Sequence, residues 1–271
     1  MAFIEIKNVN VHYECWNELG DKTIVLLHGF TGSTKTWHEV VELLPTTYRI
    51  IAVDLIGHGS TDSPDDVTYY SMDYQVELLH ELFEELQLRS FHLIGYSMGG
   101  RVALSYAVCY PDRLVSLILE SATPGIKDEQ LRLERQQSDN ILARKIEQEG
   151  VEAFIEFWEN IPLFATQKHL SVKRQEKLRN ERQQQQGTGL ANSLRMMGTG
   201  IMPQVWDHIA TLPMLTTLIT GELDSKFINI ANEMQRENKS IHHITVPSVG
   251  HAIHVENPQK FATIVKEAIS N

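Results

Sequence analysis

The five residues from Gly95 to Gly99 constrain the fold more than any other stretch of the chain. They read Gly-x-Ser-x-Gly, with Ser97 at the centre. An apolar, strand-like run precedes them at residues 91–94, and a run of small and apolar residues typical of a helix follows at residues 102–107. A serine at a sharp turn between a strand and a helix needs neighbours that carry almost no side chain. The pattern therefore predicts a nucleophile elbow, with the Ser97 hydroxyl at a helix N-terminus that favours negative charge.

Length, charge and cysteine content limit the classes of protein that the chain can belong to. Its 271 residues suit one α/β core with an insertion. The net charge of −11 argues against a nucleic-acid partner. No apolar run approaches the roughly 18 residues of a membrane span, and no signal pattern is present, so we expect a cytoplasmic protein without membrane insertion. Cys15 and Cys109 lack metal-ligand spacing, so we expect free thiols, no metal and no cofactor.

Strand-like and helix-like segments alternate along the chain. Eight strands are expected, at residues 4–6, 11–13, 23–28, 48–53, 91–94, 114–120, 214–220 and 241–246. Helices are expected from a Ser33 cap through Leu44, over residues 71–86 and over residues 258–269. Strands that recur between helices predict an α/β protein with a mostly parallel eight-stranded sheet.

The composition of the sequence changes near residue 122. Residues 127–186 contain 11 Lys or Arg and 11 Asp or Glu, no convincing strand, and helix breaks at Gly150, Pro162 and Gly187. We therefore expect a helical lid at residues 122–205, inserted between a first core part at 1–121 and a second at 206–271. The oligomeric state stays open.

Two further polar side chains follow expected strands in the order that an elbow serine requires. Asp224 lies in the loop after the seventh strand, and His251 lies in the loop after the eighth. Active sites of open α/β sheets gather at the carboxyl ends of the strands. Ser97, Asp224 and His251 therefore form a candidate catalytic triad, with Glu222 and His254 as the rival acid and base.

Backbone N–H groups complete such a site. The N–H after the nucleophile belongs to Met98, and the second donor is expected from the loop after the third strand, at Phe30. Each donor of this kind stabilises a transition state by about 2.7–4 kcal/mol.

The motifs resemble those of the α/β-hydrolase superfamily and, within it, the 2-succinyl-6-hydroxy-2,4-cyclohexadiene-1-carboxylate (SHCHC) synthases. The segments that carry the likeness are LHGFTG at 27–32, GYSMGGR at 95–101, ERQQSD at 134–139, LANSLRMMGTG at 190–200 and GELDSKF at 221–227. The first and last are common among hydrolases, whereas the segments in the expected lid are more specific. The resemblance extends along the whole chain.

This resemblance implies a lyase of menaquinone (vitamin K2) biosynthesis. Such an enzyme uses the serine, histidine and aspartate to remove a proton from a cyclohexene ring, and pyruvate then leaves by elimination. The substrate is a small polycarboxylate, and the resemblance places its binding residues at Arg101, Arg135 and Arg182, with Arg179 as the alternative to the last. It also places Tyr96 and Trp158 at the pocket wall.

Three other interpretations compete with the lyase. A serine carboxylesterase or a carbon–carbon bond hydrolase would use the same triad, but it would need a largely apolar acyl pocket. A ligand-binding protein of the same fold without catalysis would not need a complete triad with its glycines. A protein-interaction role for the lid has no positive sequence feature behind it.

Overall fold

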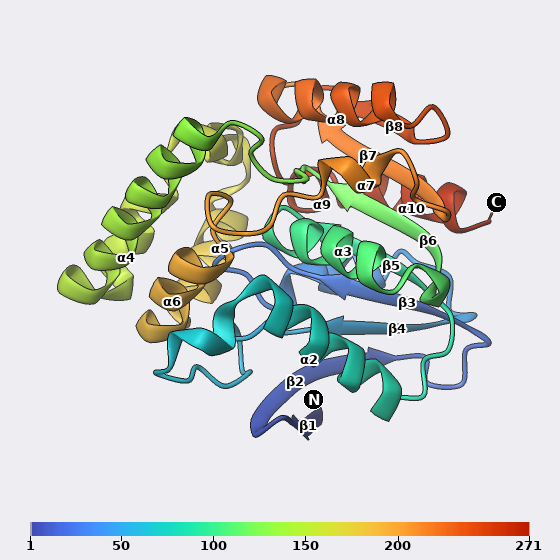
Figure 1. Cartoon of the computed structure of the whole chain (residues 1–271), viewed down its shortest axis with the longest axis horizontal. Helices are drawn as coiled ribbons and strands as arrows, with labels where there is room; N and C mark the ends of the chain where they lie inside the picture. The colour runs from blue at the N-terminus through green and yellow to red at the C-terminus, as the bar shows by residue number, and fades with distance from the viewer. Residues whose placement is uncertain (1, 271) are drawn as a thin grey trace.

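The computed structural model describes residues 2–270, which form one eight-stranded sheet with helices on both faces (Figure 1). The strand order is β1-β2-β4-β3-β5-β6-β7-β8. β2 pairs antiparallel with β1 and β4, and all the other neighbouring strands are parallel. The predicted α/β class and mostly parallel sheet are confirmed. The strands are β1 (Ala2–Ile6), β2 (Val9–Trp16), β3 (Lys22–Leu27), β4 (Tyr48–Val53), β5 (Phe91–Tyr96), β6 (Leu114–Glu120), β7 (Leu215–Gly221) and β8 (His242–Val246).

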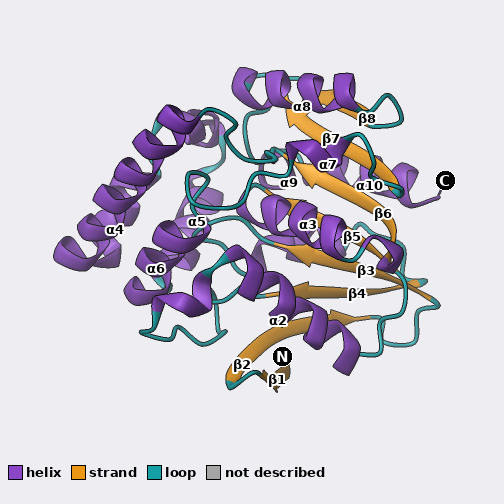
Figure 2. Cartoon of the chain, viewed as in Figure 1, coloured by secondary structure: helices purple, strands orange, loops and turns teal. Residues whose placement is uncertain are grey.

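The helices alternate with these strands (Figure 2). The α-helices are α1 (His38–Val41), α2 (Met72–Glu85), α3 (Met98–Cys109), α4 (Glu129–Trp158), α5 (Val172–Gln183), α6 (Gly187–Met197), α7 (Trp206–Ile209), α8 (Ser225–Glu237), α9 (Ile253–Glu256) and α10 (Pro258–Ser270). The 3-10 helices are η1 (Thr34–Trp37), η2 (Val67–Tyr70), η3 (Pro111–Arg113) and η4 (Pro162–His169).

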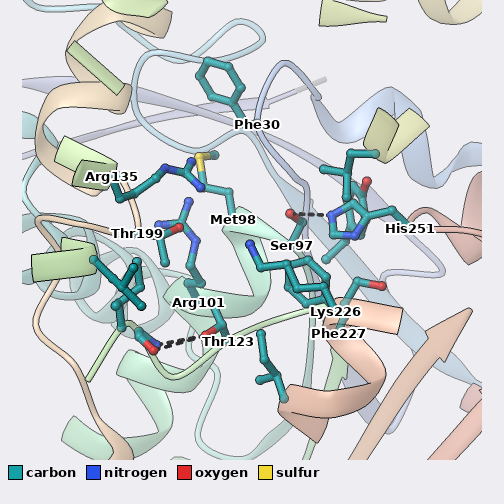
Figure 3. Close-up of a pocket in the computed structure, with 18 of the residues that line it drawn as sticks. Phe30, Ser97, Met98, Arg101, Thr123, Arg135, Thr199, Lys226, Phe227 and His251 are labelled. Carbon is teal, nitrogen blue, oxygen red and sulfur yellow. Dashed lines mark hydrogen bonds between the residues drawn. The ribbon is translucent and has the colours of Figure 1, made fainter. Parts of the chain in front are cut away.

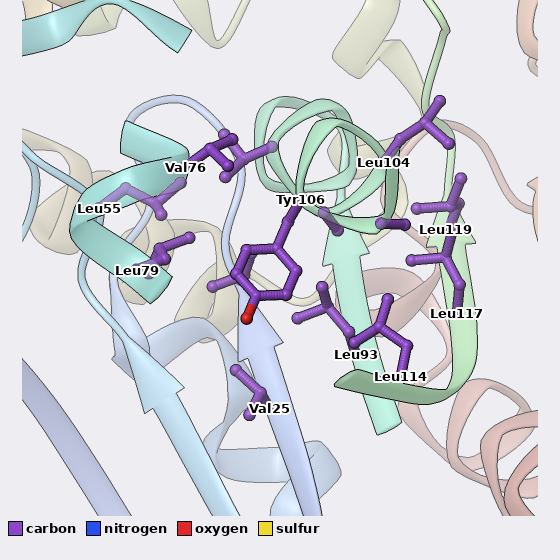
Figure 4. Close-up of a cluster of buried hydrophobic side chains, with 14 of the residues drawn as sticks. Val25, Leu55, Val76, Leu79, Leu93, Leu104, Tyr106, Leu114, Leu117 and Leu119 are labelled. Atoms are coloured by element: carbon purple, nitrogen blue, oxygen red, sulfur yellow. The ribbon is translucent and has the colours of Figure 1, made fainter. Parts of the chain in front are cut away.

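The continuous apolar runs of the central strands serve two cores. In β3, Val25 and Leu27 pack with α2 and α3 on one face, while Ile24 and Leu26 pack with α1 and α10 on the other. Side chains alternate between the faces of a strand, so a strand that is covered on both sides needs apolar residues throughout. Figure 4 shows part of the first core, around Tyr106. Each fully buried leucine there stabilises the fold by about 1.5–3 kcal/mol relative to exposure.

Helices α4, α5 and α6 lie between β6 and β7 in the sequence and cover the edge of the sheet where the parallel strands end (Figure 1). They have a small apolar cluster of their own, which includes Ile146, Phe154 and Leu190. Gly150 interrupts α4 with a φ of 83°, a left-handed conformation that glycine adopts without steric cost. The inserted helical lid is therefore present, and α4 bends where the sequence predicts a break.

Two helices differ from expectation. The segment after Ser33 is a 3-10 turn, η1, followed by the four-residue α1, and not one helix through Leu44. Hydrogen bonds from Leu43 to Val40 and from Leu44 to Val41 show the tighter three-residue spacing at its end. The sequence analysis also did not predict α8, which begins directly after Asp224.

Candidate active site

Ser97 stands at a strained turn between β5 and α3. Its φ of 50° and ψ of −104° lie outside the regions that residues with a side chain commonly adopt. A Cβ on Gly95 would lie 2.4 Å from the Gly99 carbonyl oxygen, and a Cβ on Gly99 would lie 2.3 Å from that of Leu27. Because backbone atoms cannot yield that much space, both glycines are required for the turn, as the sequence predicted.

His251 lies between the serine and the aspartate, and Figure 3 shows its contact with Ser97. Its Nε2 is 3.0 Å from Ser97 Oγ, and its Nδ1 is 2.7 Å from Asp224 Oδ2. His251 and Asp224 are both buried. The Asp224 carboxylate accepts a hydrogen bond from the Nδ1–H group, which leaves Nε2 free to accept a proton from the serine. The three predicted triad residues are thus within hydrogen-bonding distance in the required order.

The alternative base and acid, His254 and Glu222, form hydrogen bonds with residues outside the triad. His254 is buried with its Nδ1 2.8 Å from Glu120 Oε2 and its Nε2 2.9 Å from the Thr36 hydroxyl. Glu222 accepts the Ser248 backbone N–H at 2.8 Å. Their contacts lie away from Ser97, so the geometry favours Asp224 and His251.

Phe30 and Met98, whose backbone N–H groups are the predicted donors, line the same cavity as Ser97. Met98 is the first residue of α3, so its N–H has no acceptor within the helix. Phe30 follows β3 in a loop that His28 holds in place, because its Nδ1 donates to the Gly29 carbonyl at 2.8 Å while Nε2 accepts the Leu55 N–H at 3.0 Å. Burial lowers the pKa of His28, which favours the neutral ring that this pair of contacts requires.

A cavity of about 510 Å³ opens between the elbow and the lid. Its walls include Ser97 and His251 together with six aromatic residues, which are Phe30, Tyr96, Trp158, Phe164, Trp206 and Phe227. The predicted wall residues Tyr96 and Trp158 both line it. Among residues 2–270, the indole Nε1 of Trp158 and the hydroxyl of Ser121, another lining residue, are both buried without a hydrogen-bond partner. Buried polar groups in proteins usually have a partner, so these two atoms are notable in the wall of a cavity.

Basic side chains reach the same cavity (Figure 3). Arg101 is buried on the first turn of α3, and its Nη1 donates to the Met197 carbonyl. Burial, with a smaller effect from nearby Arg135, lowers the pKa of Arg101 to about 10, so it remains charged at neutral pH. Arg135, on α4, donates from Nε to Asp139 Oδ1 at 2.9 Å. Both arginines lie where the resemblance places them.

Lys226 also lines the cavity, and the sequence interpretation assigned it no role. Its position could have indicated a role, because Lys226 lies two residues after Asp224 within the segment GELDSKF that resembles the synthases.

The structure does not place Arg182 in this cavity. Its guanidinium lies 5.0 Å from the ring centroid of Phe164 and donates to Gln167 Oε1 at 2.9 Å. Phe164 lines the main cavity and also the smaller lid pocket that contains Arg182. The alternative, Arg179, forms an exposed ion pair with Glu159. Arg182 therefore lines pockets next to the main cavity, with Phe164 in the wall that they share, and its contact with the substrate stays a prediction.

Two features are absent from residues 2–270. These residues contain no cluster of three or more His, Cys, Asp or Glu side chains that could hold a metal ion. No helix formed by these residues is both long and apolar enough to cross a membrane.

Comparison with known proteins places this geometry in a family. Residues 22–258 match the sequence model of the alpha/beta hydrolase fold. A Bacillus subtilis protein provisionally named 2-succinyl-6-hydroxy-2,4-cyclohexadiene-1-carboxylate synthase is 44% identical over 92% of this chain and 91% of its own. A Shigella flexneri protein named as the same synthase is 32% identical over 89% of this chain and 91% of its own.

A solved structure agrees with these relatives. The structure of MenH from S. aureus superposes with a TM-score of 0.91 at 36% identity, covering 96% of this chain and 98% of that one. The chain therefore belongs to the α/β-hydrolase family and, within it, to the SHCHC synthases.

Proposed function

We propose that the protein is a lyase of menaquinone biosynthesis. It converts 2-succinyl-5-enolpyruvyl-6-hydroxy-3-cyclohexene-1-carboxylate to SHCHC and pyruvate. The observation that carries the proposal is the set of basic side chains, Arg101, Arg135 and Lys226, in the cavity beside Ser97. A substrate with three carboxylates needs such charges, whereas a neutral ester does not.

The change in ring unsaturation defines the bonds that break. The substrate has one ring double bond, between C3 and C4, and the product has two, between C2 and C3 and between C4 and C5. The base therefore removes the proton from C2, the double bond shifts, and the C5–O bond breaks with its electron pair. Enolpyruvate leaves and takes a proton to become pyruvate.

The residues at the elbow suit proton removal. Ser97 Oγ takes the C2 proton while His251 Nε2, 3.0 Å away, takes the serine proton. Asp224 stabilises the imidazolium that forms. Negative charge develops on the succinyl ketone oxygen next to C2, where the N–H groups of Phe30 and Met98 stabilise it as an enolate. No covalent bond to Ser97 is needed.

The proposal extends to the lid, the kind of partner and the location in the cell. Residues 122–205 act as the cover of the site, since α4 carries Arg135 and Trp158 into the cavity wall. A covered cavity strengthens the electrostatic contacts with the carboxylates. The partner is a small polycarboxylate rather than a macromolecule, and the cytoplasm is the expected location.

One comparison of substrates tests the function. Purified protein is incubated with the enolpyruvyl substrate and, separately, with p-nitrophenyl acetate and butyrate. We expect equal amounts of pyruvate and SHCHC at a turnover of about 1–10³ per second, the usual range for enzymes, and far slower ester cleavage. Ester cleavage without pyruvate release would instead establish the serine carboxylesterase, which the same triad can support.

A further inference from the structure

Two arginines of the cavity wall lie close together although both carry a positive charge. Figure 3 shows the guanidinium groups of Arg101, from α3, and Arg135, from α4, pointing toward each other. Burial lowers the pKa of Arg101, and the charge of Arg135 is the next largest cause of that shift. Like charges in a poorly hydrated site repel each other, so a site that presents both guanidinium groups to a ligand needs a negative charge nearby.

Asp139 is the carboxylate that acts on both arginines. It lies one turn after Arg135 on α4, and its side chain is only 3% exposed. Burial raises the pKa of Asp139, whereas the charge and the hydrogen bond of Arg135 and the charge of Arg101 oppose that rise. Among residues 2–270, neither arginine forms an ion pair with any other carboxylate. Asp139 therefore offsets part of the repulsion between the two guanidinium groups.

The contact between Asp139 and Arg135 uses only one nitrogen of the guanidinium. Nε of Arg135 donates to Oδ1 of Asp139 at 2.9 Å. In the part of the chain that the structure describes, the two terminal Nη groups of Arg135 have no hydrogen-bond partner. These two groups form the fork that can bind a carboxylate through two parallel hydrogen bonds. Asp139 thus holds the guanidinium at Nε and leaves the fork available in the cavity wall.

Packing does not account for Asp139. Its Oδ2 atom is buried and has no hydrogen-bond partner among residues 2–270. Gly198, directly after α6, leaves room for this oxygen, because a Cβ at that position would lie 2.4 Å from it. A buried carboxylate oxygen without a partner lowers stability. The favourable interactions of this side chain are therefore those with the arginines.

We propose that Asp139 is a positioning residue for substrate binding. It holds Arg135 at Nε, so that both Nη groups meet a substrate carboxylate, and it offsets the repulsion between Arg135 and Arg101. The inference rests on the proposed function, because a neutral substrate would gain nothing from a preorganised fork. A side chain that is already held in place loses less conformational freedom when the ligand binds.

Replacement of Asp139 by alanine and by asparagine tests the role. D139A removes both the contact and the charge, whereas D139N keeps an oxygen that can accept from Nε. We expect D139A to raise KM for the enolpyruvyl substrate roughly 3- to 10-fold, the cost of immobilising one long side chain on binding. D139N should raise KM less. The kcat of both variants should change little, because Ser97 and His251 are untouched.

A double variant shows whether Asp139 acts through Arg135. If it does, D139A raises KM in the wild-type background but does not raise it further once R135A is present. A purely structural role would give the same fold rise in both backgrounds, and that result would overturn the inference. If D139A does not fold, the isosteric D139N carries the same comparison.

Glu147 provides the matched control. It is also a carboxylate of α4 paired with an arginine, Arg195, at 2.6 Å, but it does not line the cavity, so E147A should leave KM unchanged. Substrate binding by D139A that equals or exceeds that of the wild type would also overturn the inference, because Asp139 would then compete with the substrate for Arg135. These outcomes leave pyruvate release by the wild-type protein intact. Its absence would instead overturn the proposed function, and the inference with it.

Discussion

Replacement of Ser97 by alanine is expected to lower kcat for pyruvate release by about 10²- to 10⁴-fold, the usual contribution of a positioned acid–base group. In the proposed mechanism the hydroxyl takes the substrate proton, and His251 Nε2 lies 3.0 Å from its oxygen. His251→Ala should cause a similar loss. KM should change little, because neither residue is placed to bind a carboxylate. Stopped-flow or steady-state measurement of pyruvate release reports both constants.

The double variant decides whether these residues act as one unit. If they do, Ser97→Ala combined with His251→Ala loses little more activity than either single change. Asp224→Asn should also be damaging, since it disturbs the Nδ1 contact at 2.7 Å. Glu222→Gln is the matched control, because the Glu222 carboxylate accepts the Ser248 backbone N–H and does not line the cavity. A silent Asp224→Asn beside an inactive Glu222→Gln would show that the acid is misassigned.

The second large effect is expected at the arginines. Arg101→Ala or Arg135→Ala should weaken substrate binding by about 2–5 kcal/mol, which corresponds to a rise in KM of roughly 30-fold or more, because each leaves a carboxylate unpaired in the cavity. A smaller loss in kcat should follow from poorer positioning of C2. Cleavage of a neutral ester, where measurable, should be unaffected.

Arg195 provides the control for this experiment. It is also a lid arginine, but it pairs with Glu147 at the surface and does not line the cavity. Arg195→Ala should leave KM unchanged, since exposed ion pairs contribute about 0–1 kcal/mol to stability and none to this binding. Wild-type binding by both the Arg101 and the Arg135 variant would contradict the polycarboxylate cavity and, with it, the synthase assignment.

The elbow could be predicted from sequence because its constraint is local. Gly95 and Gly99 are needed by backbone atoms within a few residues or on the neighbouring strand, and the pattern records that need directly. The same argument places Arg101, since the first turn of α3 must lie beside Ser97. The order of Asp224 and His251 follows from parallel strands whose carboxyl ends share one edge of the sheet.

Positions in the lid depend on contacts between helices that a sequence pattern does not contain. Matching along the chain brings Arg182 to the expected register, yet η4 folds between α4 and α5 and places Phe164 between Arg182 and the cavity. The position of Arg135 at the cavity agrees with the expectation because α4 covers the site directly. Lys226 was missed because α8 was missed, although Phe227, Ala231 and Met234 form an apolar face at helical spacing.

The most direct test of the central claim is a quenched-turnover experiment that measures the products and the enzyme mass together. The enzyme is mixed with the enolpyruvyl substrate, stopped with acid during steady-state turnover, and analysed by mass spectrometry. The account predicts SHCHC and pyruvate in equal amounts and an enzyme of unchanged mass, because Ser97 only transfers a proton. An acyl group from the substrate attached to Ser97 would contradict it and would assign the site to acyl transfer.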